Sequence, residues 1–256
     1  MLPTPSTSHI SFNNIYEPAE DSYLLLDTLS SPTEAAWLKQ RFPTTSPSPL
    51  ILEVGVGSGV VLAFVAANAS HILGRSDVAL LGTDLNLHAV RAGSETVLRA
   101  LEDSARDRVH RAISLGCIVG DLASAARAGE VDVLIFNPPY VPSESLPAAL
   151  PESGSGPLSS HEIFERDSKL LELSYAGGQD GMETTNRLLS QLPDVLSKRG
   201  VAYILLCAQN EPSAVRARIL AWPGGWSAEV VGSSGNKAGW EKLCILRIWR
   251  QNSSEP

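Results

Sequence analysis

Residues 50–59 read LILEVGVGSG, an apolar run that passes directly into a glycine-rich turn. The run predicts a β-strand, and the apolar residues that follow, as far as Asn68, predict a helix. Glycines let the backbone turn tightly and let a ligand approach without meeting a Cβ atom. A strand, a Gly-x-Gly-x-Gly turn and a helix in this order are typical of an α/β domain that holds a nucleotide-like cofactor at the turn. A plain glycine-rich turn stays open as the alternative.

Strands and helices alternate along the rest of the chain. Strands are predicted at Leu50–Val54, Val78–Thr83, Ile113–Val119, Val131–Asn137, Val201–Cys207, Ala228–Val231 and Lys242–Trp249. Helices are predicted at Asp21–Leu29, Gly59–Asn68, Leu87–Leu101, Thr184–Leu196 and Glu211–Ala221. This alternation predicts an α/β fold with a seven-stranded, mostly parallel sheet and helices on both faces. Only Gly232–Gly239 separates the last two strands, which is too short for a parallel crossover, so we expect an antiparallel C-terminal hairpin.

One domain is expected over residues 15–250, with flexible ends at residues 1–14 and 251–256. Residues 43–49, PTTSPSP, are predicted to form a surface loop before the first strand. Residues 141–160 hold four prolines, six serines and two glycines, which predicts a long irregular loop. A loop of this length within a compact domain is either functional or disordered.

Composition excludes several classes of protein. Apolar residues make up 43% and charged residues 19%, unlike a disordered chain. We expect no membrane span, because no apolar stretch reaches about 18 residues, and no signal peptide at Met1–Ser6. A net charge of −8 disfavours a protein that binds nucleic acid through phosphates. Cys117, Cys207 and Cys244 lie far apart, which predicts reduced thiols of a cytosolic protein, and the scattered histidines predict no metal site.

Three carboxylates stand where predicted strands end. Glu53, just before the glycine turn, suits a cation such as the ammonium group of a methionine-type cofactor better than a pyrophosphate. Asp84 follows the second strand, about 25 residues beyond the turn, where a carboxylate can accept hydrogen bonds from two ribose hydroxyls. The alternative is that Asp84 caps the next helix. Asp121, in Gly120-Asp121-Leu122, can accept the exocyclic amine of adenine, although Gly-Asp is also a common turn.

Residues 131–140 read VDVLIFNPPY, a strand that ends in Asn137-Pro138-Pro139-Tyr140. The two prolines stiffen the backbone and remove two N–H donors, which leaves carbonyl groups free to face a site. The Asn137 side-chain oxygen and the Pro138 carbonyl can accept both hydrogens of a planar NH₂ group, and the Tyr140 ring can pack on its plane. The nitrogen lone pair is then directed at a methyl donor. The alternative is a proline-rich turn with a buried tyrosine.

The glycine turn, the two aspartates and Asn-Pro-Pro-Tyr, in this order, resemble the class I S-adenosylmethionine-dependent methyltransferases that modify planar amino groups. These include adenine-N6 DNA methyltransferases and the HemK family of release-factor glutamine methyltransferases. Residues 16–22, YEPAEDS, resemble the N-terminal signature of the eukaryotic and archaeal HemK-like branch, in which this segment folds over the cofactor. Residues 177–181, GGQDG, match the family's Gly-Gly-x-Asp-Gly loop, and residues 239–246 resemble its closing strand. The resemblance covers about residues 12–250 and implies the Rossmann-like class I methyltransferase fold.

The resemblance implies S-adenosylmethionine as cofactor. It also implies N5-methylation of the glutamine in the Gly-Gly-Gln motif of the class I translation release factor. The catalytic residues it implies are Asn137, Pro138 and Tyr140, with Pro139 added for substrate binding. The cofactor-binding residues it implies are Tyr16, Pro18, Glu20, Asp21, Glu53, Gly55, Gly57, Gly59, Asp84, Leu85, Asp121, Leu122 and Asn137. Glu20 and Asp21 can instead cap the helix that follows them.

A partner is implied as well. About 50 residues precede the glycine turn, so we do not expect the N-terminal helical docking domain of the bacterial members. The eukaryotic members form a heterodimer with a small zinc-binding activator, which covers an apolar surface and adds a strand to the sheet. By resemblance, Ile113–Val119 is expected to be that exposed edge, unless the chain's own loops cover it. We expect a cytoplasmic location, with a nuclear one left open.

Other functions stay open. A histone lysine is a possible acceptor, but it must lose its proton first, which Asn-Pro-Pro-Tyr does not arrange. Adenine in a nucleic acid would require phosphate contacts and base extrusion, which the charge and the lack of a target-recognition domain disfavour. Intact Asn137–Tyr140 disfavours a catalytically silent subunit. An NAD-dependent oxidoreductase is disfavoured because its turn is usually spaced Gly-x-Gly-x-x-Gly.

Overall fold

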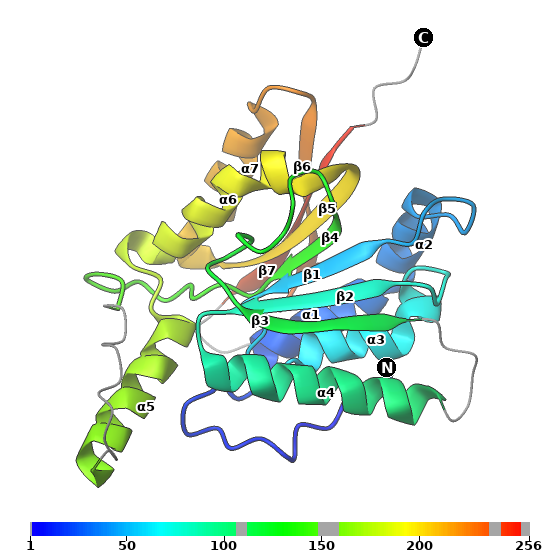
Figure 1. The fold of residues 1–256 in the computed structure, drawn as a ribbon. Helices are drawn as coiled ribbons and strands as arrows, with labels where there is room; N and C mark the ends of the chain where they lie inside the picture. Colours follow the sequence, from blue (N-terminus) through cyan, green and yellow to red (C-terminus); the bar gives the residue numbers. More distant parts are fainter. Residues whose placement is uncertain (1, 106–111, 148–158, 236–241, 252–256) are drawn as a thin grey trace.

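The computed structural model describes residues 2–105, 112–147, 159–235 and 242–251 (Figure 1). Within them, seven strands form one sheet in the order β3-β2-β1-β4-β5-β7-β6. The strands are β1 Leu50–Val54, β2 Ala79–Asp84, β3 Ile113–Val119, β4 Val131–Phe136, β5 Leu196–Cys207, β6 Trp226–Ser233 and β7 Leu243–Arg250. β1 to β5 are parallel, and β7 is antiparallel to both β5 and β6. The predicted mostly parallel sheet with an antiparallel C-terminal hairpin is therefore confirmed.

Helices cover both faces of the sheet, as predicted (Figure 1). The α-helices are α1 Glu20–Ser30, α2 Pro32–Arg41, α3 Val60–Ile72, α4 Leu87–Ala105, α5 Ser160–Tyr175, α6 Glu183–Val195 and α7 Pro212–Leu220. There are also two short 3-10 helices among the described residues, η1 Gln179–Gly181 and η2 Ala208–Asn210. α1 to α4 contribute to the core on one face, and α6 and α7 to the core on the other. None of the helices in the described ranges is long and apolar enough to cross a membrane.

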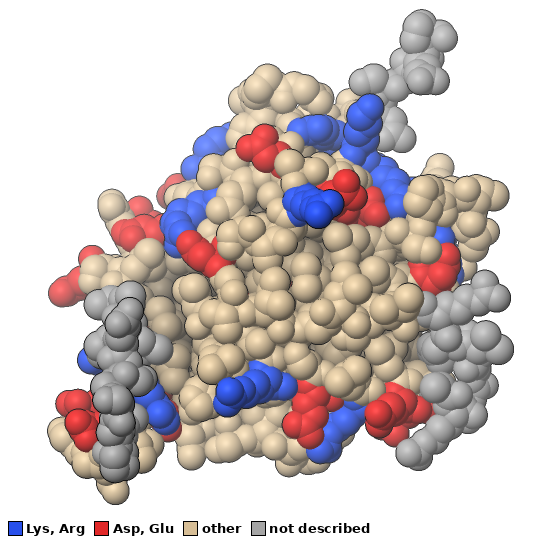
Figure 2. Space-filling view, viewed as in Figure 1, with Lys and Arg blue, Asp and Glu red and all other residues tan. Residues whose placement is uncertain are grey.

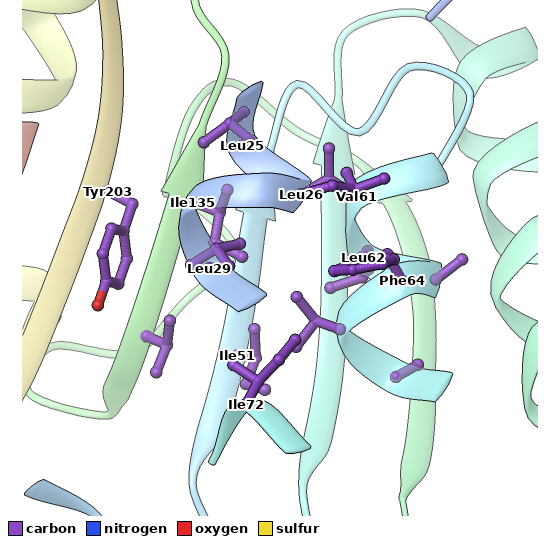
Figure 3. Close-up of a cluster of buried hydrophobic side chains, with 14 of the residues drawn as sticks. Leu25, Leu26, Leu29, Ile51, Val61, Leu62, Phe64, Ile72, Ile135 and Tyr203 are labelled. Carbon is purple, nitrogen blue, oxygen red and sulfur yellow. The ribbon is translucent and has the colours of Figure 1, made fainter. Parts of the chain in front are cut away.

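The two cores use alternate residues of the same strands, because successive side chains of a strand point to opposite faces. Ile51 of β1, Ile135 of β4 and Tyr203 of β5 face α1 and α3 (Figure 3). Their neighbours Leu52 and Phe136 belong to the core beneath α6 and α7. All six residues of β4 are buried, as expected for a central parallel strand covered on both sides.

The strand order reverses between β1 and β4, since β2 and β3 lie on one side of this pair and β5 on the other. Ligands of open α/β sheets bind at the carboxyl ends of the strands at such a switch point. The glycine turn follows β1, and Asn137 follows β4. Parallel pairing of these strands therefore brings the two motifs to one edge of the sheet.

Two segments outside the sheet contribute to this edge. Residues 7–15, from the N-terminal region that composition predicts to be flexible, lie against α4 and α5: Asn86 Nδ2 donates to the Asn14 carbonyl (2.6 Å) and Asn14 Nδ2 to Asp167 (3.2 Å). An irregular loop was predicted for residues 141–160, and its last residue, Ser160, is instead the first residue of α5. Residues 148–158 of that loop, and residues 239–241 of the closing motif, lie outside the described residues.

Candidate active site

A cavity of about 520 Å³ lies at the carboxyl ends of the central strands. Residues of the glycine turn, of the Asn-Pro-Pro-Tyr turn, of the N-terminal segment and of α5 and α6 form its walls. Of the residues predicted for the site, those that line it are Tyr16, Asp21, Glu53, Gly55, Gly57, Asp84, Leu85, Asp121, Leu122, Asn137 and Pro139. Pro18, Glu20, Gly59, Pro138 and Tyr140 are not part of its lining. The structure thus brings together carboxylates, glycines and the Asn137 amide that lie far apart in the sequence.

The three glycines of the turn share a backbone conformation, and two of them have different roles. All have positive φ, at +67° for Gly55, +51° for Gly57 and +76° for Gly59, a conformation that other residues rarely adopt. A Cβ atom on Gly57 would find no neighbour closer than 3.9 Å, so its absence leaves open space on the cavity side. A Cβ atom on Gly59 would lie 2.6 Å from the Cα atom of Gly93. Gly57 therefore leaves room for a ligand, whereas Gly59 lets α3 pack closely on α4.

Asp84 is held rigidly at the end of β2. Its two carboxylate oxygens accept hydrogen bonds from the backbone N–H groups of Gly57 (2.9 Å) and Asn86 (2.8 Å). The cap of α4 is a different side chain, since Asn86 Oδ1 accepts from the N–H of His88 (2.9 Å). Burial raises the pKa of the Asp84 carboxyl, and these backbone bonds oppose the rise. Asp84 is thus placed in the cavity wall and is not the helix cap that the sequence left open.

Glu53 lies deeper, with 3% of its surface exposed. Its Oε2 accepts from the backbone N–H of Leu62 (2.9 Å) at the start of α3. Burial raises the pKa of the Glu53 carboxyl well above its ordinary value, the Leu62 bond opposes this, and the nearby Asp84 charge adds to it. A buried carboxylate with so little compensation is a site where a cation binds favourably.

Asp121 also lines the cavity and is paired with Arg187 of α6. About half of each side chain is exposed, so this pair contributes little to stability. The next residue, Leu122, is buried at a φ of 52°. Its carbonyl accepts from the hydroxyl of Thr83 (2.8 Å), which fixes the turn after β3 against β2.

Four side chains from two distant parts of the chain meet at Asp21 Oδ2. Tyr16 and Asn137 both donate to Asp21 Oδ2, each at 3.1 Å, and the hydroxyl of Tyr140 lies 3.5 Å from the same atom. Among the described residues, Asn137 Oδ1 is buried without a hydrogen-bond partner. An acceptor in this state, in the wall of a cavity, is suited to an N–H group of a ligand.

The Gly-Gly-x-Asp-Gly loop supports the Asn-Pro-Pro-Tyr turn from behind. A Cβ atom on Gly177 would overlap the carbonyl oxygen of Pro139, and one on Gly181 would overlap that of Tyr140. Asn210, buried after β5, donates to the carbonyls of Tyr140 (3.2 Å) and Asp180 (3.0 Å). The glycines therefore allow two loops to touch backbone to backbone.

Several residues of this region were not among those predicted for the site, and three of them are informative. Ser22 and Arg187 line the cavity, and Asn210 holds the loop behind it. Ser22 belongs to the YEPAEDS signature, and Asn210 follows the carboxyl end of a parallel strand, so both had a signal. Arg187 lies in the middle of α6, where nothing in the sequence pattern distinguishes it from a surface arginine.

A cavity at the switch point of a mostly parallel α/β sheet, sharing a wall with an Asn-Pro-Pro-Tyr turn, and the similarity to the proteins below together place the chain in one class, the methyltransferases. No protein-family model matches the chain. The eRF1 methyltransferase catalytic subunit mtq2 of Schizosaccharomyces pombe is 33% identical over 253 residues, which are 98% of this chain and 96% of that protein. Methyltransferase HEMK2 of Homo sapiens is 31% identical over 252 residues, which are 96% of this chain and 95% of that protein. The chain belongs to the family of these two methyltransferases.

A bacterial protein is similar over a shorter range. The release factor glutamine methyltransferase of Rhodospirillum rubrum is 32% identical over 151 residues, which are 59% of this chain and 38% of that protein. The similarity to the mtq2 and HEMK2 proteins, in contrast, extends over nearly the whole of both chains.

Proposed function

We propose that this chain transfers a methyl group from S-adenosylmethionine to the side-chain amide nitrogen of the glutamine in the Gly-Gly-Gln motif of the class I translation release factor. The buried, unpartnered Oδ1 of Asn137, a residue that lines the cavity, carries this proposal, because it suits an acceptor that brings its own N–H groups. The names of the relatives, an eRF1 methyltransferase subunit and a release factor glutamine methyltransferase, support the same acceptor. Translation terminates in the cytoplasm, which is therefore the proposed place of action.

The cavity offers one group for each part of the cofactor. Glu53 would hold the ammonium group, Asp84 the two ribose hydroxyls and Asp121 the adenine amine. Gly57 carries no Cβ atom, which leaves room for the bound group. S-adenosylmethionine supplies an activated methyl group on its sulfonium when it is bound. Gly59 would act only through the packing of α3 on α4, and we assign Pro18 and Glu20 no contact, because neither lines the cavity.

An amide nitrogen is a poor nucleophile, because its lone pair is delocalised into the carbonyl group. Asn137 Oδ1 would accept one N–H bond and, as the motif predicts, the carbonyl of Pro138 would accept the other, although Pro138 itself is not part of the cavity lining. The two bonds fix the amide plane and raise electron density on the nitrogen. The proton becomes acidic only after the methyl group has been transferred, so the step requires no strong base. Consistent with this, no histidine is found among the described residues that line the cavity. Positioning then provides most of the rate.

We also propose a partner at the edge of the sheet. β3 ends the sheet and exposes Ile113, Leu115 and Val119 to 63%, 55% and 57%. Figure 2 shows that the middle of this face of the molecule carries few charged side chains. An exposed apolar edge strand invites pairing with another chain. A small zinc-binding activator that adds a strand beside β3 would cover it, and the mtq2 relative is itself named a catalytic subunit.

The test compares acceptors under one set of conditions. The chain, co-purified with the activator, is given S-adenosylmethionine and, in parallel, the release factor, a histone tail peptide or an adenine-containing DNA. We expect the release factor to have the highest kcat/KM, and replacement of its Gly-Gly-Gln glutamine by alanine to abolish transfer. Faster transfer to the lysine peptide or to DNA would contradict the proposal.

A further inference from the structure

Asp21 is 3% exposed, and its carboxylate joins two distant parts of the chain. Its Oδ2 accepts from Asn137 Nδ2 and from the hydroxyl of Tyr16, each at 3.1 Å, and lies 3.5 Å from the hydroxyl of Tyr140. Its Oδ1 accepts from the backbone N–H and the hydroxyl of Ser22. Asp21 therefore binds α1 to the Asn-Pro-Pro-Tyr turn, 116 residues further along the chain.

This contact determines the orientation of the Asn137 amide. A carboxylate offers only acceptor atoms, so the amide presents its NH₂ group to Asp21. Oδ1 then points away from Asp21, where it is buried and has no hydrogen-bond partner in the described part of the chain. A reversed amide would place two oxygens against each other at Asp21 and put the NH₂ group where the unpartnered Oδ1 now lies.

We propose that Asp21 is a positioning residue that keeps the Asn137 amide oxygen directed at the acceptor nitrogen. The inference rests on the proposed function, in which that nitrogen donates an N–H bond to Asn137 Oδ1. A reversed amide would set its own NH₂ group against the NH₂ group of the acceptor, and no hydrogen bond would form. Asp21 thus acts on methyl transfer through Asn137.

The substitution Asp21→Asn tests this at constant size. Its carbonyl oxygen remains opposite the Ser22 N–H, so its NH₂ group faces Asn137 and the Asn137 amide must reverse. We expect kcat to fall by about 10²- to 10³-fold, the loss typical of a misdirected hydrogen bond at a reacting group. The KM for the release factor and the Kd for the cofactor should change by less than about threefold. Asn137→Asp should also lose turnover, because it sets two carboxylates side by side.

The reciprocal exchange, Asp21→Asn together with Asn137→Asp, restores the pair. The new amide at position 21 donates to the new carboxylate at position 137, whose second oxygen points into the cavity as an acceptor. We expect the exchanged enzyme to turn over at least about tenfold faster than either single variant, a coupling that residues with independent roles do not show. Asp27→Asn, an exposed carboxylate on the same helix, is the control and should leave kcat unchanged.

The outcomes separate this inference from the proposed function. If the unmodified chain methylates no glutamine, the proposed function fails. If it does methylate the glutamine, a kcat of Asp21→Asn within about threefold of normal would overturn the positioning role. So would an exchanged enzyme that is no faster than the single variants. If Asp21→Asn does not fold, as judged by its thermal unfolding, the exchanged enzyme is compared with Asn137→Asp alone, and the absence of rescue overturns the role.

Discussion

The side-chain amide of Asn137 is the group whose removal should separate catalysis from cofactor binding. Its Oδ1 is the buried acceptor in the cavity wall, while the carboxylates proposed for the cofactor stand on other strands. Asn137→Ala should lower kcat by about 10²- to 10³-fold and leave the Kd for S-adenosylmethionine nearly unchanged. Turnover assays and calorimetric titration measure the two quantities, with Asn68→Ala on α3 as control. Near-normal turnover would show that Asn137 does not hold the acceptor.

Glu53 should make the stability of the cofactor-free chain depend on pH. Burial raises the pKa of its carboxyl above the ordinary value of 4.5, so the folded state binds this proton more tightly than the unfolded state. The stability that the carboxyl contributes is present below about pH 4.5 and is lost as the pH rises through the raised pKa. Glu53→Gln should therefore be at least about 2 °C more stable than the parent at pH 8.5, with a smaller difference at pH 5.

The measurement is thermal unfolding of both proteins without cofactor across this pH range. The exposed Glu102→Gln on α4 serves as control. Glu53→Gln should also weaken cofactor binding, because the ammonium group of the cofactor loses its charged partner. If the stability difference between Glu53→Gln and the parent does not vary with pH, the pKa of the Glu53 carboxyl is not raised by burial.

At the scale of loops and elements, Asn210 should contribute both to stability and to turnover, although it lies behind the cavity. It is buried, donates to two loop carbonyls and accepts from the backbone N–H of Cys207 (2.8 Å). Asn210→Ala should lower the free energy of unfolding by about 1–3 kcal/mol, because buried carbonyls lose their donors. It should also lower kcat, because the Tyr140 turn loses its support. Chemical denaturation and turnover assays check both effects, and the exposed Gln209→Ala should change neither.

The sequence predicted the elements that bury a continuous apolar face. β1 and β3 were predicted with their observed bounds, and all five predicted helices are present. α2 and α5 were not predicted; α2 ends just before the predicted loop at residues 43–49, and α5 begins at the last residue of the predicted loop at residues 141–160. Each begins with a polar cap, Ser31 or Ser159, with a glutamate three residues later. That start signal would have located both.

Part of the site was predictable because parallel strands end at one edge. Glu53, Asp84 and Asn137 each follow or end a strand, and their meeting in one cavity agrees with that rule. The contact of Asp21 with Asn137 joins residues 116 apart, and no periodicity relates them. The pairing of Asp121 with Arg187 could not be predicted from the sequence either, since both are half-exposed and belong to different elements.

For the whole molecule, we expect the exposed apolar strand β3 to be the surface that binds the activator subunit. Leu115→Glu places a charge in the middle of exposed β3, and we expect it to abolish co-purification with the activator subunit. Leu220→Glu, on α7 and 44% exposed, should not affect it. Size-exclusion chromatography of the co-expressed pairs measures the complex. A stable complex of Leu115→Glu with the activator would move the interface away from β3.

The most direct test of the central claim is to locate the transferred methyl group. The chain and its activator are incubated with S-adenosylmethionine and the release factor, and the digested release factor is sequenced by tandem mass spectrometry. We predict one added methyl group on the side-chain nitrogen of the Gly-Gly-Gln glutamine, absent when Asn137→Ala replaces the parent enzyme. A methyl group on any other residue, or no transfer by a chain that binds the cofactor, would contradict the account.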